Sequence, residues 1–395
     1  MSFSHAFFGN RRLRFFGFSL AGLLIIAACI WRMASPSVAE TERIRRDASM
    51  PRYEHIFVIV AENQSYGNLM HHASWAPNIQ RLAEEYGTAS RFYGEVHPSS
   101  GNYLAIVAGD TFGIVDDDAF FCRAGNKNAD CPFADQPAYV DHEISAPSLA
   151  DQLTAKGLTW KAYLEDLPTE DPLAAFWPTS DHPSGGRLNN LYGSKHNAFV
   201  HFRKINRQPL GELSRHFVGF DQLAADLASD TMPSYAHIIP NQCNDMHGLS
   251  GPNVPADCKS GEGLLRRGDA EIGMLVEQIT QSKMWREAGN AAIVITFDES
   301  DNSIFNLGPQ YCCGSDPDSE ANFGGGHILT IVITNHGPRH LVDPTPYNHY
   351  SLLRTTEIAF GISEHLGHAA DTDKGVVAMT PLFALRRNST NHAIH

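Results

Sequence analysis

The sequence contains no internal repeat and no low-complexity tract, and its composition excludes a disordered chain, a collagen or a heptad array. Positive charge is scarce, since 30 Lys and Arg residues face 44 Asp and Glu residues. This acidic balance argues against nucleic acid as a partner. An anionic substrate would therefore need a local positive centre, which a bound cation could supply. The 395 residues are otherwise ordinary in composition and allow one large α/β domain or two smaller ones.

Residues 1–39 have the features of a targeting segment. Three arginines precede an uncharged apolar run from Phe15 to Ile30, which is short for a spanning helix. A small-x-small site ends at Ala39, which predicts cleavage of a signal peptide there. Two alternatives stay open: a lipobox that would leave Cys29 lipidated, and an uncleaved membrane anchor. Each alternative predicts an exported protein, periplasmic or secreted, inner-membrane-anchored or a lipoprotein. Contact with the membrane would occur only through an uncleaved or lipidated N-terminus.

Cysteine usage agrees with export. No CxxC pair is present, which argues against a zinc–thiolate site. Without Cys29 an even set of six cysteines remains, and such a set in an exported chain predicts disulfides. Proximity in the sequence favours Cys122–Cys131 and Cys243–Cys258. Cys312 and Cys313 could form a vicinal pair or pair with other cysteines.

The remaining chain predicts a doubly wound, mostly parallel α/β sheet with helices on both faces. We expect residues 40–53 to be a polar tether and residues 54–395 to be a single domain. The expected strands are His55–Ala61, Thr159–Leu164, Tyr235–Ile239, Ala291–Phe297 and Ile328–Thr334. The expected helices are Ile79–Tyr86, Asn102–Ala108, Ser148–Lys156, Phe220–Ala228, Asp269–Ser282 and Tyr350–Phe360. Stretches 111–147, 165–215 and 240–265 should be long loops over one edge of the sheet, and the first and third of them contain cysteines.

Polar residues follow directly on several of these strands. Glu62 and Asn63 follow the first strand, and Asp298 and Glu299 follow the strand 291–297. In open α/β sheets the carboxyl ends of the strands meet at one edge, where ligands bind. Crowded carboxylates need a compensating cation, so these four residues are the candidate ligands of a divalent metal. Oxygen ligands suit Ca²⁺, Mg²⁺, Mn²⁺ or Fe.

Two histidines widen the choice of metal. Adding His247 and His327 to the oxygen ligands would favour Zn²⁺, and the sequence does not decide between these ions. His327 follows three glycines at the start of a strand. Glycines allow the backbone to approach another group closely, which makes a plain core histidine less expected at this position.

A serine cluster lies at the start of the helix expected over 102–108. Ser99 or Ser100, before Gly101, would place a hydroxyl beside the free N–H groups of the helix N-terminus, where an anion binds well. The alternative is that one of the two serines only caps the helix.

The ordered motifs carry a resemblance to a known family. They are FVIVAENQSYGNLM (57–70), HPSSGNYLAIVAGDTFGI (97–114), YGSKHNAFVHF (192–202), PNQCNDMHG (240–248), ITFDESDN (295–302), GGGHILTIVIT (324–334) and YNHYSLLRTTEIAFGI (347–362). This pattern resembles the bacterial phosphoesterase family that joins secreted acid phosphatases to phosphatidylcholine-cleaving phospholipases C, within the alkaline phosphatase-like superfamily. The 97–114 and 192–202 motifs are closer to the acid phosphatase branch, which includes enzymes acting on phosphoinositides.

The resemblance implies roles for individual residues. Ser99 matches the nucleophile that forms a phosphoserine, and Asn102 matches the asparagine that holds a phosphate oxygen. The metal ligands implied are Glu62, Asn63, Asp298 and Glu299. His97, Lys195, His196, His247 and His327 match polar positions around the phosphate or the metal, and we expect His247 or His327 to protonate the leaving group. Gly101 replaces the family's usual proline, which leaves Ser100 as a competing nucleophile, and Gly67 replaces an acid.

Three hypotheses follow for the function. The first is an exported metal-dependent phosphomonoesterase that acts on small phosphate esters or phospholipid headgroups. The second is a phosphodiesterase of phospholipase C type that uses the same site. The third is an exported protein that binds a cation or phosphate without catalysis.

Overall fold

A computed structural model describes residues 38–178, 189–301, 305, 308–314 and 324–385 of the chain. The predicted signal peptide, anchor run and lipobox lie in residues 1–37, outside the described residues. The chain divides into two compact units, residues 1–45 and 46–395. Within the described ranges, no helix has the length and apolar content needed to cross a membrane.

Eight strands form the path of the main sheet, and one more pairs with its edge. In chain order the strands are β1 (His55–Ala61), β2 (Gly87–Tyr93), β3 (Trp160–Leu164), β4 (Phe176–Trp177), β5 (Tyr192–Gly193), β6 (Phe217–Val218), β7 (Tyr235–Ile239), β8 (Ala291–Phe297), β9 (His327–Thr334), β10 (Leu341–Asp343) and β11 (Tyr347–Asn348). The sheet order is β10-β2-β9-β8-β1-β7-β3-β6, with β11 paired to β2, while β4 and β5 form a separate hairpin. Strand β9 runs antiparallel to both of its neighbours, and the other pairs in this sheet are parallel. The predicted fold class, a mostly parallel α/β sheet, is confirmed.

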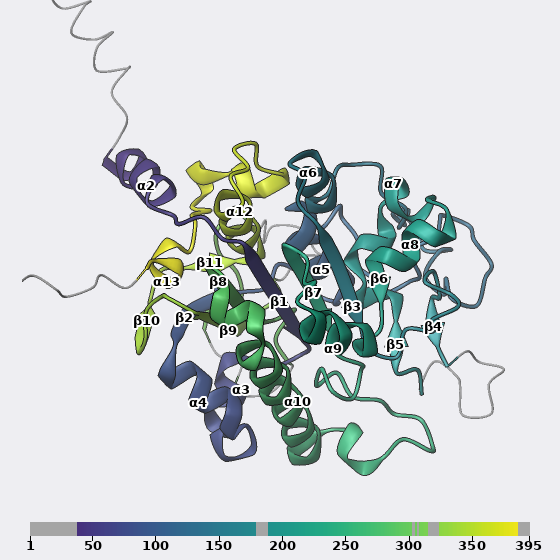
Figure 1. Ribbon diagram of the computed structural model, residues 1–395. Helices are drawn as coiled ribbons and strands as arrows, with labels where there is room; N and C mark the ends of the chain where they lie inside the picture. Colours follow the sequence, from purple (N-terminus) through teal and green to yellow (C-terminus); the bar gives the residue numbers. More distant parts are fainter. Residues whose placement is uncertain (1–37, 179–188, 302–304, 306–307, 315–323, 386–395) are drawn as a thin grey trace, which may run out of the picture. The chain divides into compact units, whose positions relative to one another are not determined.

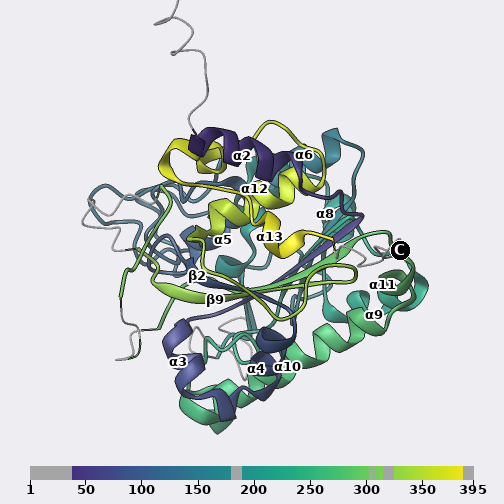
Figure 2. The ribbon, with the colours of Figure 1, turned by 90° about the vertical axis from the view of Figure 1, so that its left-hand side faces the viewer.

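Helices cover both faces of the sheet (Figures 1 and 2). The helices are α2 (Val38–Ala48), α3 (Tyr66–His71), α4 (Pro77–Glu85), α5 (Ser100–Ala108), α6 (Leu149–Ala155), α7 (Arg203–Asn206), α8 (Leu210–His216), α9 (Phe220–Ser229), α10 (Gly261–Gln281), α11 (Lys283–Glu287), α12 (His349–Ala359) and α13 (Thr380–Phe383). Figure 2 shows α5, α6 and α12 on one face and α4, α9 and α10 on the other.

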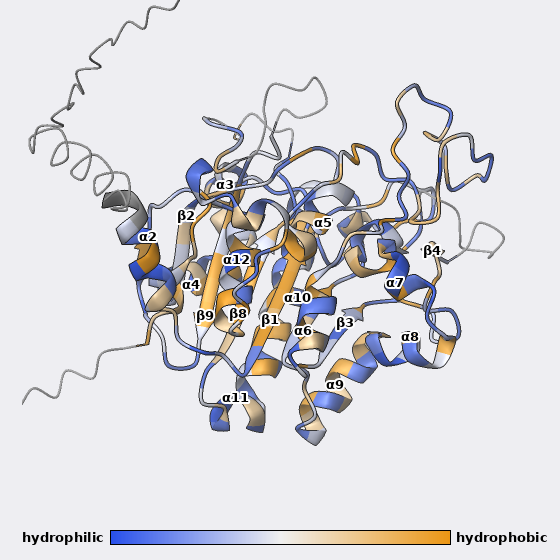
Figure 3. Cartoon of the chain, turned by 90° about the horizontal axis from the view of Figure 1, so that it is seen from above, coloured by the Kyte–Doolittle hydropathy of each residue, from blue (hydrophilic) through white to orange (hydrophobic). Residues whose placement is uncertain are grey.

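The core follows from the β-branched runs in the central strands. All seven residues of β8 are buried, as are six of the seven in β1. Figure 3 shows the hydrophobic colour concentrated on β1, β8 and β9. Strands buried on both faces need continuous apolar runs, and the helices on each side supply the covering surfaces. The central strands are therefore rigid supports for the residues that follow them.

The direction of β9 matters for the site. Because β9 is antiparallel, its first residue, His327, lies where the parallel strands end, and it pairs with Tyr93 at the end of β2. The close backbone approach predicted for the glycines before β9 is found. A Cβ on Gly325 would lie 2.6 Å from the backbone carbon of Gly94, so only glycine fits there.

Three predictions about the chain's organisation need correction. Residues 40–53 are not a plain tether: α2 covers much of the segment, Met50 and Tyr53 are buried, and Asp47 pairs with Arg354 at 2.6 Å. The stretch 165–215 is more than a loop, since it contains β4, β5, α7 and most of α8. Helix α10 begins eight residues before the predicted start at Asp269.

The segment before β1 contacts the helix α13, which lies near the end of the described residues. The hydroxyl of Tyr53, just before β1, donates to the carbonyl of Phe383 in α13 at 2.7 Å. The two rings also pack edge to face with their centroids 5.4 Å apart. Tyr53 is buried, so this contact belongs to the core.

Candidate active site

The predicted nucleophile lies beside the predicted metal ligands. Ser99 precedes α5 but does not cap it through its side chain. Instead its Oγ donates to Glu62 Oε2 at 3.0 Å. The hydroxyl also lies close enough to Asp298 to favour the charged form of that carboxyl. Ser99 is only 2% exposed. The helix-cap alternative is therefore not what the structure shows for this side chain.

Ser100 has a different environment. Its hydroxyl and its backbone N–H both lie 3.1 Å from Asp117 Oδ1 and donate to it. Asp117 thus fixes the first turn of α5 and leaves Ser99, rather than Ser100, facing the carboxylates. Gly101 is required by packing, since a Cβ there would lie 2.6 Å from Val96 Cγ2.

Three of the four predicted metal ligands gather around the ends of β1 and β8. The backbone N–H of Asn63 donates to Asp298 Oδ1 at 3.0 Å, and its side-chain amide donates to Glu62 Oε2 at 3.0 Å. Asn63 adopts a left-handed backbone with φ of 52°, which asparagine tolerates better than most residues. Glu299 faces the other side, where its Oε2 lies 2.9 Å from His97 Nδ1.

Several of these carboxylates are buried without enough partners. Glu62, Asp245 and Asp298 are fully buried, and Asp245 Oδ2 and Asp298 Oδ2 accept no hydrogen bond from any described residue. Burial raises the pKa of Asp298 to about 7, with the charge of Glu299 adding to the effect. Burial also raises the pKa of Glu299 to about 9. Lone pairs left in this state are ligands for a cation.

Two histidines join Glu62 in a group that could hold a metal ion. One ligand atom from each of Glu62, His196 and His247 lies within 4.8 Å of the others. His196 Nε2 is 3.1 Å from Glu62 Oε1, and its Nδ1 is 3.3 Å from Asp245 Oδ2. Burial holds the pKa of His196 well below its usual value, which leaves the ring neutral as a metal ligand must be. The donor set fits a divalent cation with mixed nitrogen and oxygen ligands.

Lys195 connects the histidines to Asp117. Its Nζ donates to Asp117 Oδ2 at 3.0 Å and lies 2.9 Å from His247 Nε2. The other His247 nitrogen, Nδ1, is 2.7 Å from the carbonyl of Gly248. Burial lowers the pKa of His247 to about 3, with the Lys195 charge adding to the effect, so the ring is neutral and receives a hydrogen bond from the ammonium.

Asn102 and His327 both contact the backbone near the site. The Asn102 side chain holds the preceding turn, accepting from the N–H groups of Glu95 and Val96 at 2.8 and 3.1 Å and donating to the carbonyl of Val96, and its amide also lies 3.4 Å from Glu299 Oε2. His327 stacks on Tyr66 with ring centroids 4.7 Å apart, and its Nε2 lies 2.9 Å from the carbonyl of Ser90. The contacts of His327 with described residues are to Ser90, Tyr66 and Tyr93 and do not include Ser99 or Glu62.

Sequence reasoning missed two residues of the site and underused a third. The hydroxyl of Tyr103 donates to Glu62 Oε1 at 2.7 Å, and Asp117 holds both Ser100 and Lys195. Tyr103 lies four residues after Ser99, a helical spacing that would have placed it on the same face. Asp245 follows β7 and received no role from the sequence, but its backbone carbonyl accepts from the N–H of Glu62 at 2.7 Å.

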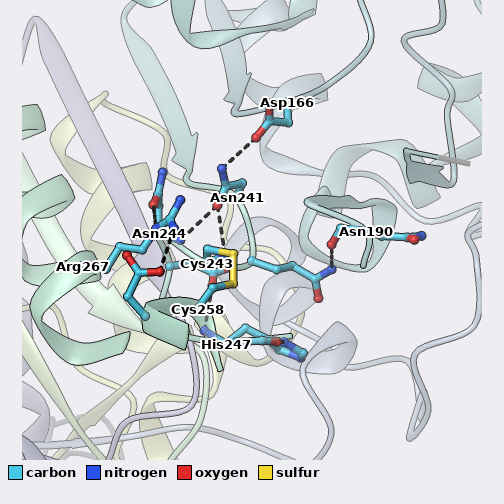
Figure 4. Close-up of a disulfide and its surroundings, with 12 residues drawn as sticks. Asp166, Asn190, Asn241, Cys243, Asn244, His247, Cys258 and Arg267 are labelled. Atoms are coloured by element: carbon cyan, nitrogen blue, oxygen red, sulfur yellow. Dashed lines mark hydrogen bonds and ion pairs between the residues drawn. A yellow bond between two sulfur atoms is a disulfide. The ribbon is translucent and has the colours of Figure 1, made fainter. Parts of the chain in front are cut away.

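Two disulfides hold the loops around this site, and both match the predicted pairs. Cys122–Cys131 closes a loop beside Asp117, and Cys243–Cys258 closes the loop that carries His247. Figure 4 shows the second bridge surrounded by Asn241, Asn244 and His247, with Asn241 bonded to Asp166. Cys312 and Cys313 form the vicinal pair, one of the two alternatives left open.

Several known proteins are similar to this chain. The chain is 26% identical over 351 residues to a phosphatidylinositol-3-phosphatase of Mycobacterium tuberculosis, covering 87% of this chain and 88% of that protein. It is 27% identical over 222 residues to a probable acid phosphatase of Kluyveromyces lactis, covering 54% of this chain and 44% of that protein. It is 23% identical over 290 residues to a phosphate-repressible acid phosphatase of Penicillium chrysogenum, covering 72% of this chain and 54% of that protein. The chain thus spans about half the length of the two fungal relatives.

Solved structures and a family profile complete the comparison. A protein in the alkaline phosphatase superfamily from Vibrio parahaemolyticus aligns with a TM-score of 0.44 at 10% identity, over 79% of this chain and 67% of that one. The PsFucS1 sulfatase from Pseudoalteromonas aligns with a TM-score of 0.45 at 13% identity, over 89% of this chain and 75% of that one. Residues 70–363, which are most of the chain, match the profile described as the Phosphoesterase family. The chain belongs to the Phosphoesterase family.

Proposed function

We propose that this protein is an exported, metal-dependent phosphatase that hydrolyses phosphomonoesters through a phosphoserine on Ser99. Membership of the Phosphoesterase family, with relatives named as phosphatases, makes it a hydrolase of phosphoric esters. The observation that carries the finer proposal is the hydrogen bond from Ser99 Oγ to Glu62, a buried carboxylate beside Asp245 and Asp298, each of which has one oxygen without a hydrogen bond from a described residue. A nucleophile is active when a base is within hydrogen-bond reach, and Glu62 meets that condition.

The residues that would hold the cation are Glu62, Asn63 and Asp298, with His196 and His247 on the opposite side. When bound, the cation supplies positive charge that lowers the pKa of the Ser99 hydroxyl and neutralises phosphoryl oxygens. The mixed ligand set keeps Zn²⁺, Mn²⁺ and Fe in consideration beside Mg²⁺ and Ca²⁺.

The chain's own residues account for the movement of protons. Ser99 Oγ attacks phosphorus, its proton passes to Glu62, and the bond from phosphorus to the ester oxygen breaks. The departing alkoxide takes a proton directly from the Lys195 ammonium, which is held by Asp117 Oδ2 at 3.0 Å and by His247 Nε2 at 2.9 Å. Water then hydrolyses the phosphoserine by the reverse route and releases phosphate. The N-terminus of α5, which begins directly after Ser99, and the side chain of His97 would stabilise the charge that develops on the phosphoryl group.

The cysteines support the proposal that the protein is exported. All six cysteines of the described ranges are in disulfides, and disulfides persist in oxidising compartments outside the cytoplasm. A periplasmic or secreted location therefore fits the chain, and fractionation of cells that express the full sequence tests it.

One substrate panel tests the proposed function. We expect turnover of p-nitrophenyl phosphate, little turnover of bis-p-nitrophenyl phosphate, and no release of phosphocholine from phosphatidylcholine. Preference for the two diesters would instead indicate a phosphodiesterase of phospholipase C type. Binding of phosphate or cation with no turnover of any of the three would indicate a protein without catalysis. Phosphoinositide monophosphates form a fourth arm, because the mycobacterial relative is named for that substrate.

A further inference from the structure

A pocket of about 460 Å³ opens beside the candidate site, within the size range of small-molecule sites. Lys195, Asp117 and His247 form part of its lining. His247 also contributes a ligand atom within 4.8 Å of one on Glu62, which in turn accepts the hydrogen bond of Ser99. A phosphate group at Ser99 would therefore have this pocket next to it.

The rest of the lining is mainly carbon surface. Pro132, Phe133, Phe176 and Leu249 contribute apolar side chains, and the polar contributions come from Gln242 and Ser250. Phe133 is 39% exposed although it is a large apolar residue. An exposed aromatic ring beside a reactive site is typical of a surface that binds a ligand.

The apolar walls are held in place. Phe133 follows Cys131 by two residues, and its N–H donates to the buried carboxylate of Asp118 at 3.1 Å. Leu249 lies inside the loop closed by Cys243–Cys258 and packs with both cysteines, and its N–H donates to the carbonyl of Cys258 at 2.8 Å. Each wall is thus fixed by a disulfide and a hydrogen bond before any ligand arrives, which reduces the entropy lost on binding.

The charge of the pocket restricts the ligand. Among the described lining residues, Lys195 and Asp117 carry charge, and they pair with each other at 3.0 Å. The described lining therefore offers no cation in excess for a second anionic group. A leaving group that carries another phosphate would lose hydration without gaining a partner.

We propose that this pocket binds the leaving group of the substrate, and that this group is uncharged and largely apolar, such as an aromatic ring. The inference rests on the proposed function, because it assumes that phosphoryl transfer occurs at Ser99. It names the substrate class of that site as phosphomonoesters of aryl or similarly apolar alcohols, in preference to those of polyols and of multiply phosphorylated groups.

The test compares two monoesters across three variants. We expect Phe133→Ala to lower kcat/KM for p-nitrophenyl phosphate by about five- to tenfold, mostly through KM, as loss of one aromatic contact predicts. The same variant should change kcat/KM for glycerol 2-phosphate less than about twofold. Phe133→Leu should fall between the wild type and Phe133→Ala with the aryl ester. Leu210→Ala, which removes an exposed apolar side chain outside this pocket, should leave both substrates unchanged. Equal losses for both substrates in Phe133→Ala would overturn the proposal.

A binding measurement separates failure of the pocket from failure of the proposed function. By calorimetry, phenylphosphonate should bind the wild-type protein more tightly than methylphosphonate, and Phe133→Ala should reduce that difference. Neither ligand is turned over, so the comparison holds whether or not Ser99 is a nucleophile. Equal affinities for the two phosphonates in the wild type would refute the pocket assignment. If the Ser99→Ala variant keeps full turnover, the phosphoserine mechanism is refuted. If that variant also still prefers phenylphosphonate, the proposal for the pocket stands.

Discussion

Removal of the cation should lower the melting temperature of the protein by several degrees, and Asp298 is the residue on which to test this. Glu62, Asp245 and Asp298 are fully buried near one another, and two of their oxygens have no hydrogen-bond partner among the described residues. A cation at one hundred times its dissociation constant stabilises the folded state by about 2.7 kcal/mol. The main unit spans 350 residues. A chain of that length has an unfolding entropy of about 0.7 kcal/mol/K, so the expected shift is about 4 °C.

The assay is thermal unfolding of protein that has been dialysed against a chelator and then titrated with each divalent ion, with metal content measured in parallel. Asp298→Asn keeps the shape of the side chain but removes one charge, so the cation-dependent shift should largely disappear. The metal-free variant should be at least as stable as metal-free wild type, because one repelling charge is gone. Asp230→Asn is the matched control, since Asp230 caps α9 and pairs with Lys283 instead. Unchanged melting and turnover after exhaustive chelation, with no metal in the purified protein, would refute this reasoning.

Three further predictions concern substitutions at single positions. Ser99→Ala should abolish turnover without loss of folding, whereas Ser100→Ala should retain most activity; the reverse order in steady-state assays would move the nucleophile to Ser100. Burial raises the pKa of half-buried Glu271 to about 7 in the folded protein, whereas the pKa of a glutamate in the unfolded chain is about 4.3. The ionised Glu271 side chain therefore destabilises the fold increasingly as the pH rises from about 4.3 to about 7. Glu271→Gln should therefore add about 1 kcal/mol to the free energy of unfolding at pH 8, after discounting for solvent screening, and much less at pH 5; equal gains in denaturant titrations at both pH values would contradict this cause. Gly325→Ala places a Cβ against the backbone of Gly94, so the protein should unfold at clearly lower denaturant concentration, and wild-type stability would show that the two segments can separate.

The strands could be predicted from the sequence because continuous apolar runs occur where both faces of a sheet are covered. The predicted bounds of β1, β7 and β8 are those of the structure. The same reasoning missed β2, whose sequence includes glycine, serine and arginine and whose pairing with β9 contains a bulge. A strand of that kind is stabilised by pairing with neighbouring strands. Those strands are distant in the sequence, so the local sequence pattern carries no information about them.

The candidate site was predictable in outline but not in its connections. The residues after β1 and β8 follow strands whose ends must meet, and the structure brings Glu62, Asn63 and Asp298 together. Asp117 could not be recognised, because it lies in a run of three aspartates within a long loop. Its contacts with Ser100 and Lys195 depend on how that loop folds back over α5. The start of α10 was also predicted too late. The first eight residues of the helix include Gly268, where a Cβ would lie 2.3 Å from Met246 Cγ, so glycine fits this packed position.

The contact between Tyr53 and Phe383 has a consequence for how this fold can be rearranged. The hydrogen bond and the ring packing bring the segment before β1 and the helix α13 to one place. A short linker could therefore join the chain near Phe383 to the chain near Tyr53, and new termini could be opened in an exposed turn elsewhere. Asp230 lies in the exposed turn after α9. A circular permutant cut near Asp230 would keep every strand of the main sheet and the loops closed by Cys122–Cys131 and Cys243–Cys258. The order of the segments along the chain would then change while the order of the strands in the sheet did not.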